Sequence, residues 1–169
     1  FYAVAGAVEV TADLQGKQHI CSLELPSAFT QPQNQDPSFL RDHMLMYATA
    51  AYGGNGTTLR FNHIPATFRF IISNGSEAAV TPQSVTVSTL DGSAVASKAT
   101  NAIFGWSSTD VSMTYDNEGH SVVTTKLSEN GVTIEKGNKY TAYSIALPLA
   151  SDEAFKGKAL SFSVRCSNG

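Results

Sequence analysis

The chain lacks the features that mark several functional classes. Only 15% of its 169 residues are charged, the formal net charge is −3, and lysine and arginine are scattered. No predicted strand carries a basic stripe, so nucleic-acid binding has no electrostatic support. No apolar run approaches the ~18–20 residues that span a bilayer. Hydrophobic residues nevertheless make up 42% of the chain, which argues against disorder and indicates one domain with a real core.

Cysteine is almost absent. Cys21 and Cys166 are the only two, and each falls on the apolar side of a predicted strand. One interpretation is that both are buried free thiols that pack as small hydrophobic groups. The other is a single disulfide in an exported protein. Neither cysteine has a second cysteine or a histidine at metal-ligand spacing, so no metal site is predicted.

Sustained helical periodicity is also missing, and the pattern is that of strands. In residues 59–74, Phe68, Phe70 and Ile72 alternate with the residues between them, which is typical of a strand with one buried face. Residues 27–38 are polar and broken by proline, which predicts a loop. Residues 39–47 fit a short helix or a strand equally well. Strands are predicted at 2–11, 18–25, 84–90, 101–107, 111–115, 120–127, 139–147 and 159–166, and as a pair within 59–74.

Turn signals separate these strands. Asn74-Gly75, Asp91-Gly92, residues 117–119 and Asn130-Gly131 supply the positive-φ positions that tight turns need. Strands spaced about 8–12 residues apart with such turns predict an all-β sandwich or barrel. We expect residues 1–169 to form a single domain. The chain begins with Phe1 rather than methionine and ends on a turn-like Cys166–Gly169, so we expect a fragment truncated at one or both ends.

No catalytic signature is present. The sequence has no nucleophile elbow, zinc-binding helix or phosphate loop, and its four histidines form no recognisable pattern. The oxygen ligands around Asp110 and Asp116 lack the spacing of a calcium loop. We therefore expect no enzyme and no cofactor. Trp106 could stack on a sugar ring if it is exposed, although its apolar neighbours Ile103 and Phe104 favour burial.

Several motifs, taken in order, resemble the fimbrillin-like family of Gram-negative gut and oral bacteria. None is specific alone, and their shared order over nearly the whole chain carries the resemblance. One departure is Ala5-Gly6, where that family has Tyr-Pro. The matching segments are FYAV at residues 1–4, LELP at 23–26 followed by a glutamine-bearing loop, MLMYA at 44–48, LRFNH at 59–63, FRF at 68–70, YSIALP at 143–148 and LSFSV at 160–164.

The resemblance implies a transthyretin-like antiparallel β-sandwich in an exported protein of the cell surface, outer membrane or fimbrium. Its function would be structural or adhesive, as a fimbrial subunit that assembles with other subunits by strand exchange. Partners would also include host or bacterial surface glycans or proteins, and membrane contact would come only through a lipid anchor outside this chain. The alternative is a surface lipoprotein that does not polymerise and binds glycans, with Trp106 as the contact.

Overall fold

The computed structural model describes residues 2–6, 9–13, 15–32, 35–51, 56–105, 111–116, 118–149 and 156–167. Within these ranges the chain is built almost entirely of strands, with one short 3₁₀ helix. The elements are β1 (Tyr2–Ala5), β2 (Glu9–Asp13), β3 (Gln18–Glu24), β4 (Ala28–Gln31), η1 (Pro37–His43), β5 (Met46–Thr49), β6 (Asn62–His63), β7 (Ala66–Ser73), β8 (Pro82–Thr89), β9 (Ala96–Ser97), β10 (Ala99–Gly105), β11 (Val111–Tyr115), β12 (Gly119–His120), β13 (Val122–Leu127), β14 (Lys139–Ala146) and β15 (Leu160–Cys166).

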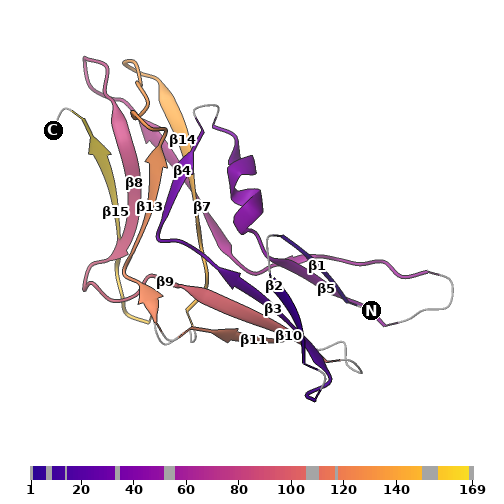
Figure 1. The fold of residues 1–169 in the computed structure, drawn as a ribbon. Coiled ribbons are helices and arrows are strands. Elements are labelled where there is room, and N and C mark those ends of the chain that lie inside the picture. Colours follow the sequence, from indigo (N-terminus) through magenta and orange to yellow (C-terminus); the bar gives the residue numbers. More distant parts are fainter. Residues whose placement is uncertain are drawn as a thin grey trace.

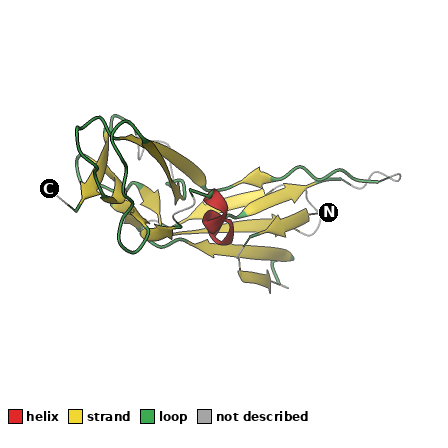
Figure 2. Ribbon diagram, turned by 90° about the horizontal axis from the view of Figure 1, so that it is seen from above, coloured by secondary structure: helices red, strands yellow, loops and turns green. Residues whose placement is uncertain are grey.

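The strands form an elongated two-layered sandwich (Figure 1). At one end, the four-stranded sheet β15-β8-β13-β4 faces the two-stranded sheet β14-β7. At the other end, the sheet β11-β10-β3-β2 lies against the three-stranded sheet β1-β5-β6, where the rings of Tyr47 and Phe104 meet at 6.2 Å. A small two-stranded sheet, β12-β9, completes the described pairings. The view from above places η1 midway along the molecule (Figure 2). The predicted all-β sandwich is confirmed.

Alternating burial along the strands explains this packing. In β8, Val85 and Val87 are buried, while Thr86 between them is partly exposed. The same period of two continues in β13, where Val123, Thr125 and Leu127 are buried. Two clusters of buried side chains form the core: a larger one that draws on strands of both ends and a smaller one between β8, β13, β14 and β7. Phe70 packs against both. All strand pairs in the described residues are antiparallel except β4 with β13, which is parallel.

Three predicted segments were wrong, and a fourth, left open between helix and strand, is resolved by the structure. The single strand predicted at residues 2–11 is two strands, because Gly6 has a φ of +121° and the chain turns there from one sheet to another. The loop predicted at 27–38 contains β4 and the start of η1. The ambiguous segment 39–47 is divided between η1 and β5. The first strand expected in 59–74 is only the two-residue β6, which comes after Phe61.

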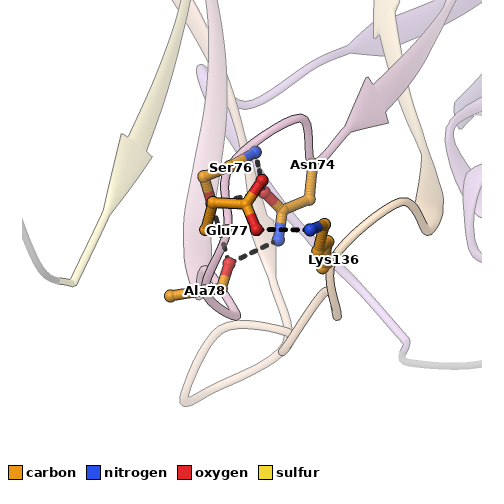
Figure 3. Close-up of polar contacts among 5 residues, drawn as sticks. All are labelled: Asn74, Ser76, Glu77, Ala78 and Lys136. Carbon is orange, nitrogen blue, oxygen red and sulfur yellow. Dashed lines mark hydrogen bonds and ion pairs between the residues drawn. The ribbon is translucent and has the colours of Figure 1, made fainter.

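The turn after β7 differs from the expected tight hairpin. Gly75 is not among the glycines with positive φ, whereas Gly92 and Gly131 are, as predicted. The side chain of Asn74 shapes this turn instead: its Nδ2 donates to the carbonyls of Ala78 and Ile134, each at 2.8 Å. Its Oδ1 accepts from the backbone N–H of Ser76 at 2.9 Å and from the Ser76 hydroxyl (Figure 3). An ion pair between Glu77 and Lys136 closes the outside of the turn.

Candidate functional site

One edge of the sandwich exposes apolar side chains that point toward its interior. On β15, Phe162 lies opposite Val87 and Val164 lies opposite Val85. Directly opposed residues share a face of the sheet, and Val85 and Val87 are core residues. Yet Phe162 is 54% exposed and Val164 is 46% exposed. The inner face of β15 is therefore only partly covered by the opposite layer.

The opposite layer ends at β7. Phe68, Phe70 and Ile72 share the face of β14 that carries buried Ser144, Ala142 and Tyr140. The Phe70 ring reaches across to Phe162, with 5.9 Å between ring centroids. We call the six side chains that meet here the β7–β15 edge: Phe68, Phe70 and Ile72 of β7, and Leu160, Phe162 and Val164 of β15.

Both strands at this edge lack a second neighbour within the described ranges. β7 pairs only with β14, and β15 pairs only with β8. The backbone of Thr141 and Tyr143 hydrogen-bonds to side chains on the far side of β14, away from β7. Their register partners Ile71 and Arg69 must then direct their N–H and C=O groups away from β14. β7 thus presents a row of backbone groups ready to pair with another strand.

The other edge of the same sheet is closed. Gln31, fully buried at the end of β4, donates from Nε2 to the Thr141 carbonyl at 2.8 Å. Its Oε1 accepts the Tyr143 N–H at 2.7 Å, so its amide mimics the peptide group of a neighbouring strand. Gln35 accepts the Thr141 N–H at 2.7 Å, and the Thr125 hydroxyl donates to the Tyr143 carbonyl at 2.9 Å. Three side chains therefore satisfy the free edge of β14. No described side chain bonds to the backbone of β7 in this way.

This arrangement suits the addition of a strand. An extended segment laid along β7 gains main-chain hydrogen bonds, while its alternate side chains cover the apolar residues beneath. No cluster of three metal-ligating side chains occurs in the described part of the chain. The four histidines are dispersed over β3, η1, β6 and β12, and His120 uses its Nε2 for a 2.9 Å contact with the Leu25 carbonyl.

The structure keeps the two cysteines apart as free thiols. Cys21 is fully buried on β3, and burial raises the pKa of its thiol. Cys166 ends β15 in a different sheet and is partly exposed. The register shifts between Arg165 and Cys166, so Cys166 lies opposite Pro82 rather than Gln83. Of the two thiols, only that of Cys21 is fully buried.

The remaining sequence candidates fall elsewhere. Trp106 and Asp110 lie outside the described residues. The sequence did not predict the role of Gln31, which was expected to lie in a loop. No periodicity indicates a buried glutamine whose side chain takes the place of a strand.

None of the helices in the described ranges is long and apolar enough to cross a membrane. No protein-family model matches the chain, and no curated protein or solved structure shows significant similarity to it.

Proposed function

We propose that this protein is a non-catalytic structural or adhesive subunit of bacterial surface fimbriae that assembles by strand exchange. The observation that carries the proposal is the β7–β15 edge, where inward-facing Phe162 and Val164 remain about half exposed beside an unpaired strand. Monomeric soluble proteins rarely leave a long apolar strand edge uncovered, because such an edge recruits other chains. A partner strand is the simplest occupant of this edge.

The incoming strand would run along β7 and cover its inner face. β7 has eight residues and contains no proline, so each residue from Ala66 to Ser73 has a backbone N–H. The partner would place apolar side chains at alternate positions over Phe68, Phe70 and Ile72 and over the β15 residues opposite them. Its intervening side chains would face outward beside Arg69, which favours acidic or neutral polar residues there.

The closed edge of β14 determines which edge of the β14-β7 sheet would accept a partner strand. With Gln31, Gln35 and Thr125 occupying one edge, this sheet offers only β7 to a partner. A surface that binds a different surface of the next copy makes a heterologous contact, which extends into a filament when the rotation does not close. This is the geometry that a fimbrial stalk requires.

The sequence resemblance to fimbrillin-like proteins supplies the biological setting of the proposal. On that basis the fold would be transthyretin-like, the protein would be exported to the outer membrane or fimbrium, and a lipid anchor outside this chain would hold it there. Other fimbrial subunits would be its partners, together with glycans or proteins of host or bacterial surfaces.

The test uses the complete gene product, expressed with its export signal, treated mildly with trypsin and run unboiled in SDS. We expect a ladder of multimers that collapses on boiling. Phe162→Asp should abolish the ladder, because a carboxylate in the apolar edge would be desolvated by the partner strand. Leu90→Asp is the matched control, since Leu90 is 72% exposed and lies outside the β7–β15 edge, and its ladder should equal that of the wild type.

Two results would contradict the proposal. A single monomer band from the wild type would exclude a stalk subunit and turn attention to glycan binding, which loss of glycan-array signal in Trp106→Ala would support. A ladder that survives Phe162→Asp, in a variant shown by circular dichroism to be folded, would place assembly on another surface.

A further inference from the structure

A second feature lies on the outer face of the β14-β7 sheet, separate from the edge where assembly is proposed. Here η1 packs beside β14, and a pocket of about 740 Å³ opens between the helix, the sheet and the start of the chain. Pockets of roughly 300–1,000 Å³ are the size that accommodates small organic ligands. Among the described residues, its lining comes from β1, η1, β5, β7 and β14 and from the residues beside them.

The walls are mainly apolar. Met44, Met46 and Leu40 of η1 are among the residues that line the pocket. Methionine side chains are unbranched and polarizable, so they adapt to apolar ligands of varied shape. Ala5 lies opposite Met46 in the β1–β5 register and keeps that wall open, because its side chain is only a methyl group.

Close backbone packing supports this wall. Gly6, which also lines the pocket, has a φ of +121°, and a Cβ at this position would lie 1.8 Å from the Met44 carbonyl oxygen. Only glycine fits such an approach. The end of β1 is thereby held against the Met44–Met46 segment, and the pocket is a fixed feature of the fold.

Polar groups converge on the same space. Tyr143 and Thr67 face it from the outer side of the sheet, and neither hydroxyl has a hydrogen-bond partner within the described ranges. Ser38 and Arg41 are three residues apart in a 3₁₀ helix, so they lie on one face of η1. The Nε of Arg41 lies 3.5 Å from Oδ1 of Asp42, and this is its one ion pair among the described residues. The Arg41 side chain is 82% exposed.

The charged side chains of η1 determine which end of the helix would favour a ligand anion. Asp36 caps the start of the helix, where it accepts the Ser38 N–H at 2.9 Å and the Ser38 hydroxyl at 2.7 Å. These bonds lower the pKa of Asp36, so its carboxylate stays ionised and repels anions at that end. Arg41 lies five residues further along, about 10 Å away at the 3₁₀ rise. Arg41 is the only cationic side chain among the described lining residues, so it is the group that a ligand carboxylate would meet.

We propose that this pocket binds amphipathic carboxylates, molecules with an apolar body that lies against Met44, Met46 and Leu40 and a carboxylate that meets Arg41. The site is independent of strand exchange, because it uses the outer face of the sheet and none of the six side chains of the β7–β15 edge. Evidence against fimbrial assembly would therefore leave the proposal of carboxylate binding unaffected.

The chain offers an internal control for the test. It contains three methionines, two in the pocket and Met113 on β11 at a distance from it. In protein labelled with ¹³C at the methionine methyl groups, titration with dodecanoate below its micellar concentration should shift the Met44 and Met46 signals and leave Met113 unchanged. Dodecylamine, with the same chain and the opposite charge, should bind more weakly.

Two variants separate the apolar and the charged contributions. Ala5→Phe should fill the pocket and abolish the methionine shifts. Arg41→Gln should weaken dodecanoate binding about two- to fivefold, the effect of one ion pair at a largely exposed site, and leave dodecanol binding unchanged. Arg165→Gln, on β15, is the control and should bind as the wild type does. The proposal would be overturned if the wild type showed no shifts or if all three methionines shifted equally. It would also be overturned if neither Ala5→Phe nor Arg41→Gln changed dodecanoate binding.

Discussion

Gln31 is paired with Tyr143 as if it were part of a neighbouring strand: its side-chain Oε1 accepts the Tyr143 backbone N–H at 2.7 Å, and its Nε2 donates to the Thr141 carbonyl two residues away. The same Nε2 lies 3.2 Å from the hydroxyl of Tyr140. This relationship closes one edge of the β14-β7 sheet and leaves the opposite edge, β7, as the one that can accept a strand.

We predict that Gln31→Met destabilises the protein by about 2–3 kcal/mol, because it leaves the part-buried Tyr143 N–H and Thr141 carbonyl without partners. Methionine is close to glutamine in shape, so little of this loss would come from a cavity. Urea unfolding monitored by circular dichroism measures the change. Gln35→Met is the control: Gln35 is exposed and makes one such bond, so its loss should stay below about 1 kcal/mol. Equal effects of the two substitutions would refute the role assigned to Gln31.

Asp91 gives a pH-dependent prediction. It accepts hydrogen bonds from the Ser93 hydroxyl at 2.6 Å and the Ser93 N–H at 3.0 Å, which lower the pKa of Asp91 from 3.8 to about 2. A carboxyl whose pKa is depressed by folding stabilises the native state above its ordinary pKa, and that contribution disappears as the pH falls through the folded value.

Asp91→Ala should therefore lower the melting temperature at pH 7, and the difference from the wild type should shrink between about pH 4 and pH 2. Thermal melts across this pH range provide the test, and a difference between Asp91→Ala and wild type that is constant with pH would contradict it.

The two thiols should differ sharply in reactivity. Cys166 is partly exposed, whereas Cys21 is fully buried and its pKa is raised, so little thiolate forms there. A thiol-specific chromogenic reagent should modify one cysteine per native chain and two after unfolding in denaturant. Cys166→Ser should remove the native reaction. If two thiols appear only after addition of a reductant, the cysteines are instead joined by a disulfide.

The sequence predicted the parts of the fold that depend on alternation within one strand. Phe68, Phe70 and Ile72 face inward as expected, because burial on one side of a strand leaves a period of two in the chain. The division of residues 2–11 was not predictable, since it depends on the close approach of Gly6 to the Met44 carbonyl, a contact between segments far apart in sequence.

The candidate site was predictable only in part. The apolar alternation of Leu160, Phe162 and Val164 was visible, but alternation cannot reveal that the opposite layer stops short and leaves these residues uncovered. Gln31 gave no signal, because a glutamine in a proline-rich polar segment is ordinarily a loop residue. Its role arises from hydrogen bonds to residues more than 100 positions away.

The most direct test of the account is hydrogen exchange, measured residue by residue in the isolated chain and in assembled fimbriae. The account predicts that the amides of Arg69 and Ile71, which face the free edge of β7, exchange rapidly in the monomer and become protected on assembly. The amides of Thr141 and Tyr143, already bonded to Gln35 and Gln31, should be protected in both states. Unchanged exchange at Arg69 and Ile71 in assembled material would contradict strand addition at β7.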